Sequence, residues 1–158
     1  MMAYFSRLKT DIVIVPIFLL ILLTGTGYSE VTKDEIPPII KSGLDAYKSS
    51  GPEAAIVNWI KGSPYDGSKE AMGQANLFRQ VETFYGKYVD YTPIAIIQLT
   101  PTTKIIYLSM NFVSGPVFCK FLVYKTQDKK SWILSGKFNF NTEPEQVLPS
   151  TLLNIKRQ

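Results

Sequence analysis

Apolar positions recur every three or four residues over three stretches in the first half of the chain, which is the spacing of amphipathic helices. These stretches are residues 37–49, 52–60 and 69–85. Ser68 belongs to the residue types that cap helix starts, and Gly86 stands where the third pattern ends, as C-terminal glycines commonly do. The sequence therefore predicts three successive helices, the last of which ends at Gly86.

The third predicted helix carries a broad apolar stripe that extends over two adjoining faces. Its members are Met72, Ala75, Leu77, Phe78, Val81 and Phe84. An apolar surface of this breadth predicts that the helix is central and largely covered by the rest of the protein.

After Gly86 the apolar residues recur at every second position, which is the period of a β-strand. Strands are expected at about 94–100, 104–113, 117–125 and 131–141. The turns between them are short, as in antiparallel hairpins. The predicted fold class is therefore α+β, with N-terminal helices packed on a four-stranded antiparallel β-meander.

Alternation divides the predicted sheet into two faces of different character. One face is wholly apolar and should lie under the helices; it holds Ile106, Leu108, Met110, Phe112, Val117, Cys119, Phe121, Val123, Trp132, Leu134, Phe138 and Phe140. The other, called the mixed face here, includes Tyr107, Asn111, Phe118, Lys120, Leu122 and Tyr124. Aromatic side chains interleaved with polar ones are typical of an interface, so we expect this face to bind a partner.

The first thirty residues differ from the rest of the chain. Arg7 and Lys9 precede an uncharged apolar run at 12–23, and small residues follow it up to Ser29. A basic start, a short apolar run and a small-residue exit are the parts of a secretory signal peptide. The run is also shorter than the roughly 20 residues of a spanning helix. The sequence therefore predicts a signal peptide at 1–29, with an uncleaved membrane anchor as the alternative.

Cleavage after Ser29 would leave one α+β domain at 30–150 and a C-terminal tail at 151–158. The expected location is periplasmic or secreted, and the membrane would be met only through the signal segment before cleavage. The tail region, about 147–155, contains a small apolar cluster. It could fold back over the mixed face within one chain.

Composition narrows the possible chemistry. The chain contains no histidine and a single cysteine, Cys119. Catalytic systems that need a histidine base and metal sites built from histidines or several thiolates are therefore excluded. We expect no metal and no cofactor. The 17 Lys and Arg residues barely exceed the 13 Asp and Glu residues, which argues against nucleic acid as a partner.

Several phrases of the chain resemble a known superfamily. The segments "GKYVDY" at 86–91, "GPVFCKFLVYK" at 115–125 and "KFNFNTEPEQVLP" at 137–149 are similar to small exported bacterial proteins of the nuclear transport factor 2-like superfamily. The resemblance covers about residues 32–150 and implies a curved, cone-shaped sheet. Members of this superfamily include isomerases, dehydratases and binding modules, and many dimerise through the sheet. The fold alone does not determine the activity.

The resemblance also suggests where a site could lie. Enzymes of the superfamily use a carboxylate base with a tyrosine or aspartate donor inside the cone. Glu82 and Tyr85 are the candidates in this chain. Asp66, Asp90 and Tyr107 are further candidates for the same roles. A solvated helix residue is the alternative for Glu82, and a turn former is the alternative for Asp66.

The walls of such a pocket would include Trp59 and Phe78. A core position is the alternative for Trp59, which is expected to meet Phe78, Phe121 and Trp132 between the helices and the sheet.

Three functions follow from these patterns. The first is an exported, non-catalytic binding domain that holds a small apolar ligand or a protein partner. The second is an acid–base enzyme with a carboxylate base in the cone pocket, and the third is an envelope assembly or interaction protein. In each case a homodimer through the mixed face is expected, with Phe118 and Leu122 buried in the interface.

Overall fold

The structure is a computed structural model, and it describes residues 31–128, 130–136 and 138–154. The predicted signal peptide and its cleavage site lie outside the described residues, as does the end of the tail beyond residue 154.

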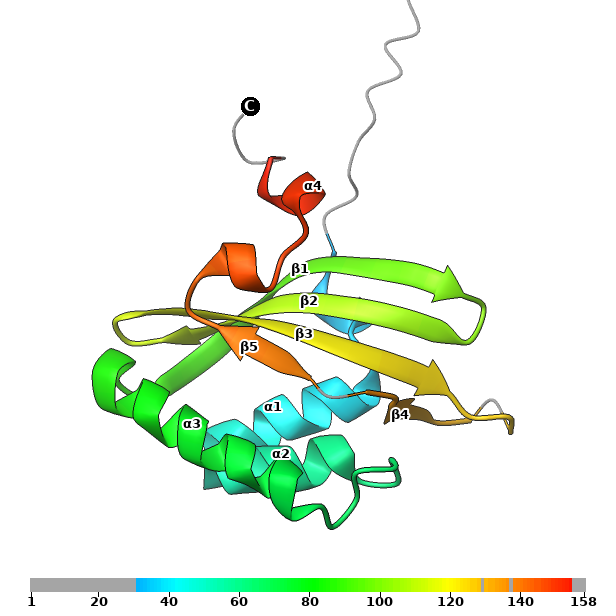
Figure 1. The fold of residues 1–158 in the computed structure, drawn as a ribbon, viewed down its shortest axis with the longest axis horizontal. Coiled ribbons are helices and arrows are strands. Elements are labelled where there is room, and N and C mark those ends of the chain that lie inside the picture. Colours follow the sequence, from blue (N-terminus) through cyan, green and yellow to red (C-terminus); the bar gives the residue numbers. More distant parts are fainter. Residues whose placement is uncertain (1–30, 129, 137, 155–158) are drawn as a thin grey trace, which may run out of the picture.

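Three helices lie together on one face of a sheet (Figure 1). After a short 3-10 turn, η1 (Lys33–Glu35), they are α1 (Pro38–Ser50), α2 (Pro52–Ile60) and α3 (Lys69–Tyr85). Each begins and ends where the sequence predicts, within about a residue. Proline opens α1 and α2, where its missing N–H costs no hydrogen bond.

The ends of α3 are formed by the two residues that the sequence indicates. The Ser68 hydroxyl accepts a hydrogen bond from the Ala71 N–H at 3.3 Å. Gly86 has a φ of 79°, a left-handed conformation that favours glycine, and its N–H donates to the Glu82 carbonyl. The chain then turns directly into the sheet.

The strands form one antiparallel sheet, which confirms the α+β class. They are β1 (Tyr88–Thr100), β2 (Thr103–Phe112), β3 (Gly115–Lys125), β4 (Trp132–Leu134) and β5 (Asn139–Asn141). The order is β1-β2-β3-β4, and β5 also pairs with β3.

The fourth predicted strand is interrupted. Leu134 pairs with Val123 and Phe140 pairs with Cys119, so six residues on the outer side oppose four on β3. The two additional residues loop out of the ladder, which splits the strand into β4 and β5. The sheet is therefore narrow at this edge.

The core lies between the apolar sheet face and the three helices, as predicted. Its sheet side contains Ile106, Leu108, Met110, Val117, Cys119, Phe121 and Val123, all with no exposed surface. Leu134 and Phe138 are buried as well, whereas Trp132 and Phe140 are only half-buried against the core. Both half-buried rings stand at the edge where the strand is interrupted.

The C-terminal part crosses to the opposite face of the sheet (Figure 1). It forms η2 (Pro144–Gln146) and α4 (Ser150–Leu153). Val147 and Leu148 are buried there in a second apolar cluster with Tyr107, and Leu152 packs against it. The sheet is thus covered on both sides, by helices on one and by the tail on part of the other.

Candidate functional site

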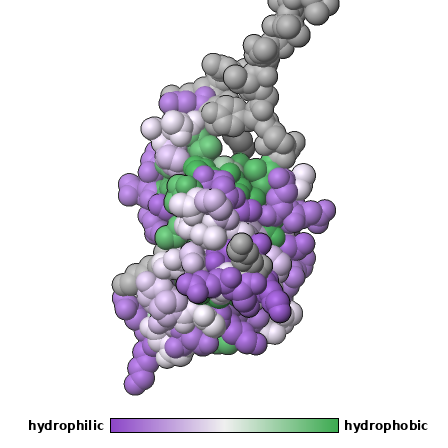
Figure 2. Space-filling model, turned by 90° about the vertical axis from the view of Figure 1, so that its right-hand side faces the viewer, coloured by the Kyte–Doolittle hydropathy of each residue, from purple (hydrophilic) through white to green (hydrophobic). Residues whose placement is uncertain are grey.

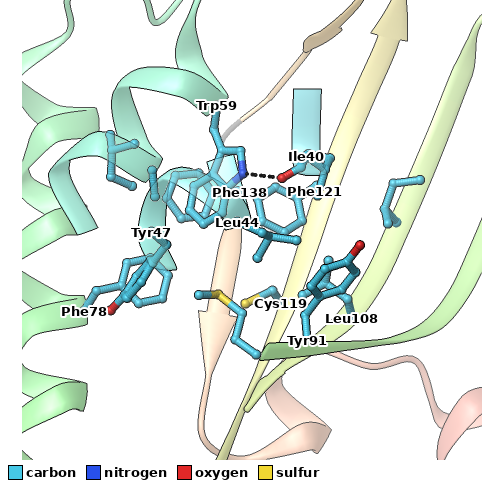
Figure 3. Close-up of a cluster of buried hydrophobic side chains, with 14 of the residues drawn as sticks. Ile40, Leu44, Tyr47, Trp59, Phe78, Tyr91, Leu108, Cys119, Phe121 and Phe138 are labelled. Carbon is cyan, nitrogen blue, oxygen red and sulfur yellow. Dashed lines mark hydrogen bonds between the residues drawn. The ribbon is translucent and has the colours of Figure 1, made fainter. Parts of the chain in front are cut away.

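The space between helices and sheet, where a cone pocket was expected, is filled by aromatic rings. Trp59 and Phe78, the candidate pocket walls, have no exposed surface. The Trp59 ring lies 5.1 Å from that of Phe121 and 5.3 Å from that of Phe138, and Phe78 stacks on Phe140 at 4.1 Å. Figure 3 shows Trp59 from α2, Phe78 from α3 and Phe121 from the sheet in this filled interior. Such interdigitated rings leave little room for a ligand.

Trp59 is held in place by the backbone of α1. Its indole nitrogen donates a hydrogen bond to the Ile40 carbonyl at 3.1 Å (Figure 3). The ring lies against Gly43, where a Cβ atom would be 2.0 Å from the same nitrogen. Only glycine allows α1 and the indole to approach this closely.

A small cavity remains beside the core, at the junction of α2, α3 and β4. It has a volume of about 90 Å³ and is lined by Ile60, Tyr65, Glu70, Ala71, Gln74, Leu134 and Phe138. Ligand pockets usually measure about 300–1,000 Å³. This cavity has room for a few waters, which each occupy about 30 Å³ in the liquid.

Glu82 lies beside Tyr47, which the sequence did not indicate as a site residue. The Tyr47 hydroxyl from α1 is buried and makes no hydrogen bond within the described part of the chain. Burial raises the Tyr47 pKa, and the nearby Glu82 carboxylate raises it further by its charge. Glu82 itself is half-buried. The structure therefore brings Glu82 to Tyr47, and Glu82 does not line the cavity beside the core.

Tyr85, the second catalytic candidate, belongs to the corner between α3 and the sheet. Its carbonyl accepts a hydrogen bond from the Ser114 N–H at 2.8 Å, and its ring lies against Gly115. A Cβ at Gly115 would be 2.5 Å from that ring. These contacts fix the turn between β2 and β3 onto the end of α3.

The two aspartates considered as bases both hold local structure. Asp66 accepts a hydrogen bond from the Gly62 N–H at 2.8 Å, which is the turn role that the sequence left open. Asp90 accepts from the Asn111 amide at 2.8 Å, and Lys33 lies 3.5 Å from it. The Asn111 hydrogen bond and the Lys33 charge hold the Asp90 pKa below its usual range.

The mixed face is polar at one end. Asn111 donates to both Asp90 and the Thr92 hydroxyl, at 2.8 and 3.0 Å, and accepts from the Ser109 hydroxyl at 2.9 Å. Asn111 thus joins β1 to β2 across the sheet surface.

The other part of the mixed face is partly occupied by the tail. Tyr107 is 4% exposed and Phe118 packs against the same cluster as Val147 and Leu148. Lys120, Leu122 and Tyr124 are half-buried on the outer side of β3. The tail therefore covers part of the surface on which the homodimer prediction depends, and the dimer itself stays a prediction.

An apolar groove that the sequence reasoning missed lies along α3. Its volume is about 640 Å³, and its lining consists of Leu77, Gln80, Val81, Phe84, Tyr85, Phe140, Asn141 and Thr142. Phe84 is 80% exposed and Leu77 is 44% exposed. The expectation of a largely covered α3 is therefore wrong. The short strand β5 is too small to cover the second apolar side of the helix.

Within residues 31–128, 130–136 and 138–154, no helix is both long and apolar enough to cross a membrane. Over the same residues, no three histidine, cysteine, aspartate or glutamate side chains are grouped so that they could hold a metal ion.

Comparisons of the chain with models of protein families, with curated proteins and with solved structures gave no match. The observed α+β architecture, with an antiparallel sheet and several helices, is compatible with a nuclear transport factor 2-like fold.

Proposed function

We propose that this chain is an exported, non-catalytic binding domain of the nuclear transport factor 2-like type. Its partner is a protein, bound through an extended segment in the groove between α3 and β5. The observation that carries this proposal is the exposed ring of Phe84, 80% accessible beside an apolar groove of about 640 Å³.

Because the interior is filled, binding of a protein partner at the surface is better supported than binding of a small apolar ligand inside the domain. Trp59, Phe78 and Phe121 are fully buried and contact one another, and the cavity beside them measures about 90 Å³. Glu82 borders the buried Tyr47 hydroxyl instead of a hollow that a substrate could enter. The acid–base alternative therefore has less support than binding.

The groove offers a partner both apolar surface and backbone hydrogen bonds. Leu77, Val81 and Phe84 follow one another at helical spacing along α3 and form one wall. Phe140 forms part of the other wall and stacks on the core residue Phe78. Because the wall rests on the core, the groove is preformed.

The open edge of β5 favours an extended partner segment. It pairs with β3 on one side, and in the described part of the chain no strand pairs with its other side. An open strand edge presents unpaired N–H and C=O groups, which an extended peptide can satisfy by adding a strand. Apolar side chains of such a peptide would then point at Phe84 and Leu77.

Peptide display on the purified chain tests the proposal. Wild-type protein should enrich peptides with apolar residues at alternating positions, and Phe84→Ser should bind them about 10–100 times more weakly, because an apolar ring contributes about 1.5–3 kcal/mol when buried. Leu99→Ser is the matched control, since Leu99 is 53% exposed on β1 away from the groove. Methylation of the peptide's backbone nitrogens should also abolish binding.

Both serine variants should keep wild-type stability, because the side chains that they remove are exposed. The proposal fails if no peptide is enriched. It also fails if selected peptides bind Phe84→Ser as tightly as wild type.

A further inference from the structure

A second groove lies at the end of the molecule that carries the turn between β3 and β4. It runs between the start of α1, the end of α2 and that turn, and its volume is about 600 Å³. Its lining combines apolar and polar residues: Pro38, Ile39, Ser42, Lys61, Gly62, Thr126, Asp128, Lys130, Ser131, Trp132 and Ile133. The groove does not overlap the one along α3, so it stands independently of the function proposed above.

Two lysines line this groove, and two more lie near its Trp132 ring. Lys61 and Lys130 line it and are exposed. Lys104 and Lys125 place their ammonium groups 5.0 and 5.9 Å from the centre of the Trp132 ring, which is itself part of the lining. None of the four forms an ion pair within the described part of the chain. Figure 2 shows that hydrophilic side chains dominate this end of the molecule.

The neighbouring carboxylates are held by their own loops. Asp128 lines the groove, but it accepts hydrogen bonds from the Thr126 hydroxyl and the Lys130 N–H. Asp66 accepts from the Gly62 N–H. Glu35, whose charge acts on Lys104, accepts from both the N–H and the hydroxyl of Thr32. Local donors thus occupy these carboxylates, while the lysine ammonium groups stay available to a ligand.

Trp132 contributes more than apolar surface. A cation over an aromatic ring is attracted to its face by about 0.5–1 kcal/mol at an exposed site. Lys104 and Lys125 are therefore held beside the groove before any ligand arrives. Charges that are already positioned lose less freedom when a ligand binds.

We propose that this groove binds an acidic oligosaccharide. The apolar floor of Pro38, Ile39, Trp132 and Ile133 fits the C–H faces of sugar rings, and the lysines fit carboxylate or sulfate groups spaced along the saccharide. Nucleic acid is the less favoured polyanion, because its sites are larger and need a strongly basic surface. The chain has only 17 Lys and Arg against 13 Asp and Glu.

Tryptophan fluorescence reports this binding directly. The chain has two tryptophans; Trp59 is fully buried, whereas Trp132 lines the groove and is half-buried. Wild-type protein is titrated with a hexamer of galacturonic acid, a heparin-derived hexasaccharide, neutral maltohexaose and a single-stranded 12-mer DNA. At least one acidic saccharide should change the emission, maltohexaose should not, and Trp132→Phe should remove the change. Calorimetry on the same samples gives the affinity without relying on fluorescence.

Paired lysine variants separate this groove from general charge attraction. Lys61→Gln combined with Lys130→Gln should weaken binding about tenfold, because bonds to charged groups are the stronger polar contacts. Lys48→Gln combined with Lys87→Gln removes the same charge at the opposite end of the molecule and should leave the affinity unchanged. Equal weakening by both pairs, or no binding of either acidic hexamer, would overturn the proposal. Tighter binding of the 12-mer DNA than of both acidic saccharides would contradict the assignment of an oligosaccharide as the ligand.

Discussion

Replacing Gly43 by alanine is the sharpest test of how the core is assembled. Gly43 lies inside α1, where alanine normally stabilises a helix by about 0.5–1 kcal/mol. In this chain the added Cβ would lie 2.0 Å from Trp59 Nε1 and 2.2 Å from Cδ1. Contacts this short force the indole or the helix to move.

Neither movement is cheap. Trp59 is fully buried against Phe121 and Phe138, so its ring cannot shift without displacing these two rings. Overpacking a core typically costs about 1–3 kcal/mol. A shifted indole would also lose its 3.1 Å hydrogen bond to the Ile40 carbonyl, and an unpaired buried donor costs about 1–3 kcal/mol. After subtracting the helix gain, we expect a net loss of about 1–5 kcal/mol.

Urea unfolding followed by circular dichroism measures this loss. Gly73→Ala is the matched control, because Gly73 lies within α3 and an added Cβ there meets no atom within 4 Å. The control should gain up to about 1 kcal/mol. The double variant Gly43→Ala with Trp59→Phe should lose less than the sum of the two single losses, because the clash involves the indole. A Gly43→Ala chain as stable as Gly73→Ala would refute the close packing of α1 on Trp59.

Three further predictions follow from other parts of the structure. Burial raises the pKa of the Tyr47 and Tyr88 hydroxyls and of the Cys119 thiol, so these groups bind their protons more tightly in the folded chain. The free energy of unfolding should therefore be level between about pH 6 and pH 8 and fall above about pH 9, by up to ~1.4 kcal/mol per pH unit for each group. Urea titrations at each pH measure this, and undiminished stability at about pH 11 would contradict it. Ser68→Ala should lower the free energy of unfolding by about 0.5–2 kcal/mol, because α3 loses its N-terminal cap. An unchanged melting temperature would show that the cap does not stabilise the protein. Leu122→Asp should convert the expected homodimer into a folded monomer in sedimentation; if the wild type is already monomeric at high concentration, the dimer prediction is wrong.

Most elements of the fold could be read from the sequence, although β1 begins at Tyr88 and the predicted strand began only at about residue 94. Proline at the starts of α1 and α2, Ser68 before α3 and Gly86 after it are local signals, and they act within one turn of the chain. The alternation in β2 and β3 correctly separated the buried face from the mixed face. The split of the fourth strand was missed, because the loop between Leu134 and Asn139 arises from pairing with β3 and leaves no clear mark in its own sequence.

The candidate site was harder to foresee. The sequence indicated Glu82, but its neighbour Tyr47 is 35 positions away and reaches it only in the folded chain, where the Tyr47 ring lies 5.4 Å from that of Phe78 on α3. The sequence showed the apolar residues of α3, but it did not show which of them are exposed. Phe78 and Phe84 look alike in the sequence, and one has no exposed surface while the other is 80% exposed.

The sequence by itself determined the order of helices and strands, the apolar face of the sheet and the exclusion of histidine-dependent chemistry. These properties depend on local backbone preferences and on residue type, which are independent of distant neighbours. Only the tertiary structure decided that aromatic rings fill the interior, that the tail covers Tyr107 and that Phe84 is left in an open groove. Those outcomes depend on how much surface each element can cover. The surface that one element buries on another depends on how the two lie in space. The pattern of residues along the chain therefore does not determine it.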